Sequence, residues 1–237
     1  MSEAIEPPRG LVIAAGGWII FSSFASLGFQ FPLHLSPSSL TPAIRMLLLT
    51  CVVGMMIAWP LVRLCQIPRD RMILRTTFDM LTLAFMWQMI VWPLRLATPW
   101  PIERTLLLDL FVVAYLVGCA GMLAAVSSMQ SSLARGCAMI VCILLTVGLQ
   151  IPLALFGFTN LGFTNVFLEN IFQGSVPMLL SIMNSPTSLP ESREWESLVA
   201  CAICNVSLFC VGATLGAITA TQSVSQSNQV ASGRRAI

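Results

Sequence analysis

Residues 105–126 read TLLLDLFVVAYLVGCAGMLAAV, an apolar run with a single charged residue, Asp109. Five other runs of about 19–23 residues have the same character, and short arginine-bearing loops separate several of them. Since roughly 20 apolar residues cross the hydrocarbon core of a bilayer as a helix, each run predicts a membrane span. The sequence therefore predicts an all-α, polytopic helical bundle with six spans: Leu11–Phe31, Met46–Leu64, Thr76–Leu94, Thr105–Val126, Cys137–Leu155 and Leu198–Ala220.

The composition leaves little room for anything outside the membrane. The chain has 237 residues, of which 57% are hydrophobic and only 9% are charged, whereas a soluble domain carries about 25% charged residues. We expect one transmembrane domain over residues 1–220 and a disordered polar cytoplasmic tail over residues 221–237, which lacks the apolar content that ordering requires. The first apolar run is too long for a cleavable signal peptide and predicts a retained span.

Arginine sets the expected orientation, because short cytoplasmic loops retain positive charge. The densest cluster, Arg63 to Arg75, separates the second and third spans. Placing it inside puts eight arginines inside and four outside, and puts both termini in the cytoplasm. We therefore expect an integral protein of a bacterial inner membrane.

One further apolar segment, Val166–Met183, is interrupted near its middle by polar residues and a proline: Glu169, Asn170, Gln173, Gly174 and Pro177. A lipid-facing helix with this polar set would be costly. We expect a re-entrant or interfacial helix on the outer face, with a seventh span as the alternative.

The chain offers few groups for catalysis or cofactor binding. It has no lysine and one histidine, His34, which lies in a loop. A bis-histidine haem needs two imidazoles, and helical-bundle metal sites usually need two or more such ligands. We therefore predict no cofactor, no metal, no nucleic-acid partner and no catalytic site, with a site shared with another subunit left open.

Among the polar residues within or at the edges of the spans, three are candidates for a functional role. Gln88 is near the middle of the third span, while Asp79 and Asp109 each lie about one turn in from opposite faces. Intramembrane acids are functional candidates by default. We expect these two to be interfacial residues that pair with nearby arginines, such as Arg75 four residues before Asp79 and Arg104 five residues before Asp109.

Cys201 and Cys204 form a Cys-x-x-Cys at the start of the sixth span. Quinone-linked membrane thiol oxidases have such a pair in a comparable position. A thiol at a helix N-terminus also has a lowered pKa. Those enzymes need a second pair on the same face, and here only Cys51, within the membrane, is available. The pair is a weak redox candidate.

Gly212 and Gly216 form a Gly-xxx-Gly stripe in the sixth span. Small residues at this spacing let helix backbones approach closely. The stripe predicts packing within the bundle, and a homodimer face is the alternative.

The arginine-rich inner loop is the expected contact with a cytoplasmic partner or with anionic lipid. Its members are Arg63, Arg69, Arg71 and Arg75. Each arginine near an anionic surface contributes about 1 kcal/mol. The alternative is that these charges serve orientation alone.

Three functions fit these features to different degrees. The first is a non-catalytic accessory or scaffold subunit that binds other membrane subunits in the bilayer. The second is a permease that works with a separate cytoplasmic ATPase, since the layout of spans resembles that of ABC-2-type exporters, although no motif carries the resemblance. The third is the quinone-linked thiol protein.

Overall fold

The computed structural model describes residues 9–28, 37–66, 72–126, 131–147, 175–184 and 188–234. Every regular element within these ranges is helical, which confirms the all-α prediction. The elements are α1 (Arg9–Gly28), α2 (Pro37–Val53), the π-helical turn η1 (Gly54–Ala58), α3 (Trp59–Cys65), α4 (Met72–Ala97), α5 (Ile102–Val126), α6 (Ser132–Val147), α9 (Ser175–Asn184) and α10 (Ser192–Arg234).

Local signals explain where several helices begin and end. Proline disfavours the helical conformation of the residue before it, and α4 ends at Ala97, two residues before Pro99, although it accommodates Pro93 in its last turns. The side chain of Glu194, in the first turn of α10, accepts a hydrogen bond from the backbone N–H of Glu191 (2.8 Å), as in a capping box. The π-helical turn ends at Ala58, two residues before Pro60, whose ring in a regular helix would crowd the carbonyl four residues earlier, that of Met56.

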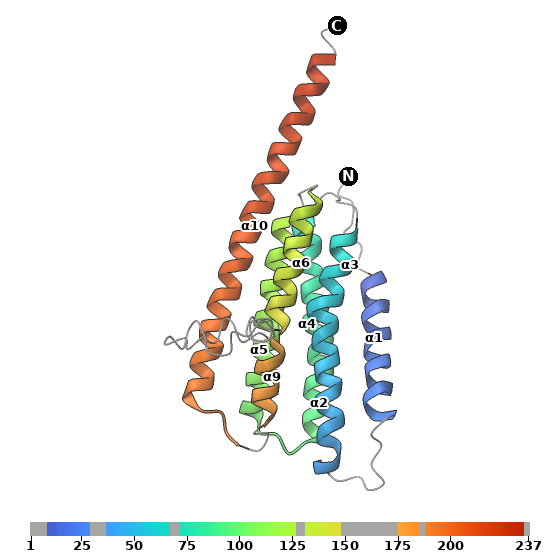
Figure 1. Ribbon diagram of the computed structural model, residues 1–237, viewed down its shortest axis with the longest axis vertical. Helices are drawn as coiled ribbons and strands as arrows, with labels where there is room; N and C mark the ends of the chain where they lie inside the picture. The colour runs from blue at the N-terminus through green and yellow to red at the C-terminus, as the bar shows by residue number, and fades with distance from the viewer. Residues whose placement is uncertain are drawn as a thin grey trace, which may run out of the picture.

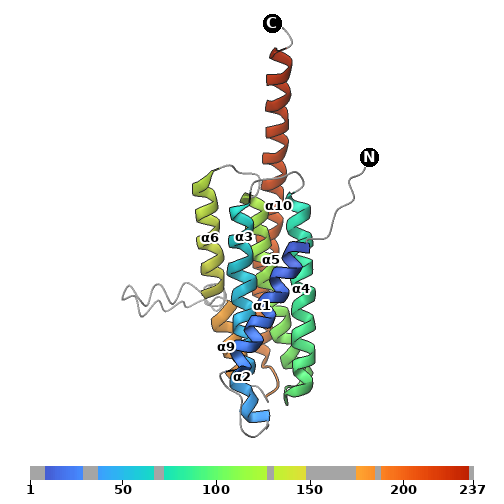
Figure 2. The ribbon, with the colours of Figure 1, turned by 90° about the vertical axis from the view of Figure 1, so that its right-hand side faces the viewer.

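The helices run up and down along one axis. Figure 1 shows α1 descending, α2 and α3 ascending, α4 descending, α5 ascending, α6 descending and α10 ascending. The first and last helices therefore begin and end toward the same side of the bundle (Figures 1 and 2).

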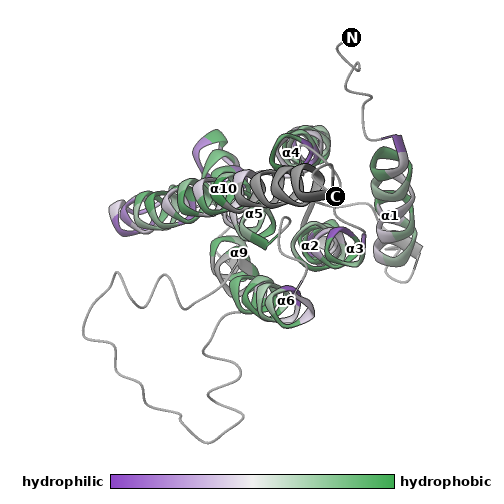
Figure 3. Cartoon of the chain, turned by 90° about the horizontal axis from the view of Figure 1, so that it is seen from above, coloured by the Kyte–Doolittle hydropathy of each residue, from purple (hydrophilic) through white to green (hydrophobic). Residues whose placement is uncertain are grey.

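α5 is the centre of the bundle. It packs most extensively against α10 and also contacts α4, α6 and α9. Most of its side chains are buried, including Phe111, Tyr115 and Leu116. Viewed from above, most of the helical residues are hydrophobic, and α1 lies at the periphery (Figure 3). Many large apolar side chains face outward, among them Phe24, Phe85 and Ile140. An apolar exterior is what a bilayer requires, because lipid replaces water around it.

A tryptophan of α1 forms a hydrogen bond to the neighbouring helix α2. The indole N–H of Trp18 donates a hydrogen bond to the carbonyl of Thr50 on α2 (2.9 Å). The same ring lies over Gly54, where a Cβ would come within 2.3 Å of the indole nitrogen. Glycine at this position therefore allows α1 to approach the π-helical turn.

α6 and α9 lie one below the other along the bundle (Figures 1 and 2). α6 has 16 residues and α9 has 10, which correspond to about 24 Å and about 15 Å of helix. α9 contacts α2, α5 and α6 and buries Leu179, Ile182 and Met183. Residues 175–183 of the predicted outer-face element therefore lie in a short helix that packs against three other helices and leaves Leu180 exposed, while residues 166–174 lie outside the described part.

α10 extends well past the bundle. It continues as a helix to Arg234, so residues 221–234 are helical where the sequence predicts a disordered tail (Figure 1). The physical reason is that extending an existing helix needs no new nucleation, which is the costly step. Gly233 is the only glycine after Gly216 and no proline follows Pro190, so nothing breaks the helix earlier.

Four helical segments are long and apolar enough to cross a membrane: Arg9–Ser26, Leu40–Cys65, Ile102–Val126 and Ser192–Ile218. The chain is therefore a multi-pass membrane protein by helix length and composition. α4 has 26 residues, but Asp79 and Gln88 lower its hydropathy, and α6 is a shorter apolar helix.

Candidate functional site

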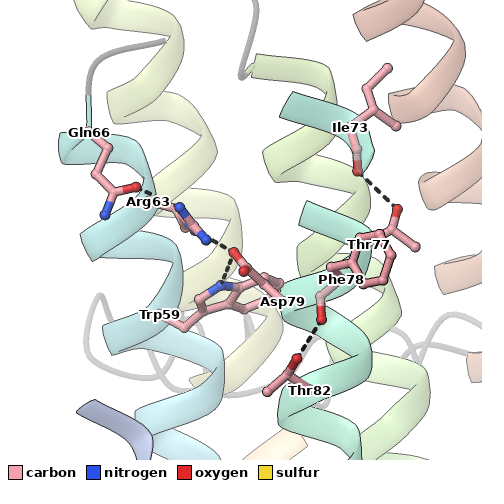
Figure 4. A network of polar contacts seen from close by, with 8 residues as sticks. All are labelled: Trp59, Arg63, Gln66, Ile73, Thr77, Phe78, Asp79 and Thr82. Atoms are coloured by element: carbon pink, nitrogen blue, oxygen red, sulfur yellow. Dashed lines mark hydrogen bonds and ion pairs between the residues drawn. The ribbon is translucent and has the colours of Figure 1, made fainter. Parts of the chain in front are cut away.

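The polar side chains inside the bundle pair between helices. At the end of the bundle where α3 ends and α4 begins, Asp79 of α4 forms an ion pair with Arg63 of α3 (Figure 4). The indole N–H of Trp59 also donates to this carboxylate at 3.4 Å, and Arg63 donates to the amide oxygen of Gln66 at 2.6 Å. Asp79 is 1% exposed, so its charge depends on these donors.

The hydroxyl groups beside this ion pair are satisfied within α4. Thr77 donates to the carbonyl of Ile73 (2.9 Å), and Thr82 donates to the carbonyl of Phe78 (2.8 Å), as Figure 4 shows. Such bonds to the preceding turn leave a threonine hydroxyl without need of an outside partner.

A second cluster joins α4 to α5 near the opposite end. The amide nitrogen of Gln88 lies 2.9 Å and 2.8 Å from the two carboxylate oxygens of Asp109. The amide oxygen of Gln88 accepts a hydrogen bond from the indole of Trp92. Asp109 is buried, so Gln88 supplies donors that lipid could not.

A third cluster joins α5 to α10. Arg104 forms an ion pair with Glu194 (2.6 Å) and donates to the hydroxyl of Ser188 (2.6 Å) and to its carbonyl (3.2 Å). Arg104 is 3% exposed, and Glu194 is 26% exposed. This network fixes the start of α10 to the start of α5.

Arg45 of α2 holds the end of α9. Its guanidinium donates to the carbonyl of Met183 at 2.6 Å. The last carbonyls of a helix have no partner within the helix and carry partial negative charge, which a cation stabilises.

These contacts correct the pairing expected for the two acids. Asp79 pairs with an arginine, but with Arg63 on another helix and not with Arg75 on its own. Asp109 pairs with Gln88, and Arg104 pairs with Glu194. Sequence spacing identifies neighbours on one helix, whereas these partners meet only because the helices pack.

A cavity of about 920 Å³ lies between α1, the η1–α3 segment and α4. Its walls are mainly apolar, with Leu11, Met55 and Leu83 among them. This volume is near the upper end of the roughly 300–1,000 Å³ typical of small-molecule sites. π-helical turns occur often at functional sites, and η1 forms part of this wall.

One end of the cavity is charged. Arg63, Gln66, Arg75 and Asp79 line it there. Arg75 is exposed and, among the described residues, makes no hydrogen bond or ion pair. Two of the four predicted contact residues, Arg63 and Arg75, thus share one cavity, while Arg69 and Arg71 lie outside the described residues.

The two cysteines of the Cys-x-x-Cys differ in environment. Cys201 is buried and lies within hydrogen-bonding reach of Tyr115, and Cys204 is partly exposed. Asn205 donates to the carbonyl of Cys201 (2.9 Å) and contacts its sulfur (3.3 Å). Every cysteine in the described segments is a free thiol.

The Gly-xxx-Gly stripe of α10 faces α5. A Cβ on Gly212 would lie 2.0 Å from the carbonyl oxygen of Gly121, and one on Gly216 would lie 2.4 Å from that of Ala124. On the α5 side, a Cβ on Gly118 would lie 1.8 Å from the side-chain oxygen of Asn205. Glycines on both helices therefore allow backbone contact inside the bundle.

Sequence reasoning missed the roles of Trp59 and Glu194, because their partners are 20 and 90 residues away along the chain. Within the described ranges no group of three or more His, Cys, Asp or Glu residues could hold a metal, and His34 lies outside those ranges. No protein-family model, curated protein or solved structure matches the chain, so its site is defined by this geometry alone.

Proposed function

We propose that this protein is a non-catalytic transmembrane subunit of a larger membrane complex, with six spans and both termini in the cytoplasm. The observation that supports this most is the pairing of the acids Asp79, Asp109 and Glu194. Each is engaged by a donor on a different helix. Groups used in this way join helices, whereas ion-coupled carriers need acids that are free to exchange protons or ions.

The alternating helix directions support six crossings. α4 is about 39 Å long, enough to cross the bilayer despite its lower hydropathy. In this proposal α6 and α9 share the fifth crossing, with α9 as the outer half. A broken helix at membrane depth is tolerated where protein encloses it, and α2, α5 and α6 surround α9.

The extension of α10 supports a role in assembly. Residues 221–234 project beyond the bundle at the end where α3 ends, which the arginine distribution assigns to the cytoplasm (Figure 1). This polar part of α10 extends past the other described helices (Figure 1) and gives a partner subunit a surface to bind.

The experiment is purification of the full chain from its native membrane in a mild detergent, followed by quantitative mass spectrometry. We expect at least one other membrane polypeptide at fixed stoichiometry. Truncation of the chain after Ala220 should lower the yield of that co-purifying polypeptide without unfolding the bundle. Recovery of the chain alone would contradict the proposal, and recovery with only an ATPase would favour the permease.

The thiol hypothesis is tested separately. Replacing Cys201 and Cys204 by alanine should leave the assembly intact, because both are free thiols, and a free cysteine in a helix acts as a small apolar residue. A quinone-coupled redox signal that disappears in the double variant would support the enzyme instead.

A further inference from the structure

The cavity between α1, α3 and α4 combines a large apolar space with a charged end. α1 packs mainly against α2 and meets α4 at few positions, so the cavity separates α1 from α4. Ala14 and Trp18 of α1, Ala58 near α3 and Met86 of α4 are among its lining residues. Such a space, within a bundle whose exterior is apolar, suits a hydrocarbon chain.

The described residues that line the charged end carry a net positive charge. Arg63 and Asp79 neutralise each other as an ion pair, whereas Arg75 has no partner among the described residues. Arg75 also lines a small adjoining hollow together with Arg63 and Arg135. Among the described residues, three guanidinium groups therefore line this end and the adjoining hollow, and one carboxylate offsets them.

This end lies where α3 ends and α4 begins, the side that the arginine distribution places in the cytoplasm. Headgroups of lipids in that leaflet lie at this level, and their acyl chains point toward the middle of the bilayer. The charged end and the apolar space are thus arranged in the same order as the two parts of a lipid.

We propose that the cavity binds one anionic phospholipid of the cytoplasmic leaflet. Its headgroup phosphate contacts Arg75, and an acyl chain occupies the space between α1, α3 and α4. Arginine suits this role because its guanidinium recognises phosphate oxygens bidentately and stays charged. Trp18 over Gly54 fixes α1 as one wall, so the cavity exists before the lipid enters.

The test is native mass spectrometry of the full chain in detergent with phosphatidylglycerol or phosphatidylcholine added at equal concentration. We expect one phosphatidylglycerol per chain and weaker binding of phosphatidylcholine. Arg75→Gln should weaken phosphatidylglycerol binding about fivefold, because one arginine near the headgroup is removed. Arg193→Gln, which removes an exposed arginine from the start of α10, is the matched control and should not change it.

A second pair of variants tests the apolar part. Ala14→Phe fills the cavity from α1 and should abolish the single lipid adduct. Ile13→Phe changes the neighbouring residue, which is 76% exposed and does not line the cavity, and should retain the adduct. Ala58→Phe, with Val53→Phe as its control, repeats the test from the opposite wall if Ala14→Phe fails to elute as a folded species.

Three results would overturn the proposal. Equal binding of the two lipids would show that the charge has no role. Retention of the adduct in both Arg75→Gln and the cavity-filling variants would place the lipid elsewhere. An equal loss in Arg193→Gln would indicate a general charge effect on lipids around the bundle.

Discussion

At the scale of single residues, the protein places its buried charges where a second helix can satisfy them. Asp79 illustrates the rule, since Arg63 and Trp59 reach it from α3. An ion pair of this kind is weak evidence for stability in itself, but removing one partner leaves an uncompensated charge. Lipid cannot supply the missing hydrogen bonds. Removing one partner therefore costs more free energy here than it would at a water-exposed surface.

Replacing Asp79 by alanine should therefore destabilise the bundle by about 3 kcal/mol, the low end for a broken buried pair, because Arg63 keeps 18% exposure and its bond to Gln66. The apparent melting temperature in detergent measures this. The double variant Arg63→Met with Asp79→Leu should recover most of the loss. A single variant as stable as the parent would show that the pair is unimportant.

Asp109 provides a contrast between charge and hydrogen bonding. Asp109→Asn should cost less than about 1 kcal/mol, since its amide oxygen still accepts from Gln88. Gln88→Leu should cost more, about 1–3 kcal/mol, because the carboxylate loses the donor that touches both oxygens. The same melting measurement applies, and the reverse order of the two variants would contradict the account.

At the scale of whole elements, close backbone contact decides how α10 sits on α5. Glycines on the two helices face each other's backbones, and a side chain at Gly121, Gly212 or Gly216 would meet backbone atoms that cannot move aside. α1 shows the opposite situation, because Gly10, Gly16 and Gly17 have open space around them. The same residue type thus supports packing in one helix and has no steric role in another.

Gly212→Ala should destabilise the protein by about 1–3 kcal/mol, because the new methyl group overlaps the carbonyl of Gly121. Gly136→Ala in α6 makes the same chemical change where no atom lies within 4 Å, and should be neutral or stabilising by about 1 kcal/mol. Thermal stability in detergent distinguishes the two. Equal effects would mean that α10 does not depend on close approach to α5.

At the scale of the whole molecule, the fold is a membrane bundle organised around α5, with α1 at the periphery and α10 continuing past the end (Figures 1 and 3). Its orientation can be measured directly. Reporter fusions at Arg71 and at Ser188 should lie on opposite faces, with Arg71 in the cytoplasm, because the arginine split favours that side. Finding both reporters on one face would contradict the six-span topology.

The amino-acid sequence alone determined that the chain is helical and membrane-embedded. An apolar run such as 105–126 must be helical in lipid, because only a helix satisfies every backbone hydrogen-bonding group within such a segment. The same reasoning placed Gln88 near the middle of a span and Asp79 and Asp109 about one turn in from opposite faces. It could not give their partners, since local spacing favoured Arg75 and Arg104.

Tertiary structure alone decided which groups meet. Arg63 reaches Asp79 because α3 lies beside α4, and Arg104 reaches Glu194 because the glycines of α10 bring it onto α5. The cavity beside Arg75 exists only because Trp18 holds α1 against Gly54 while α1 meets α4 at few positions. Such contacts depend on how helix surfaces fit together, and residues 90 positions apart carry no local signal of that fit.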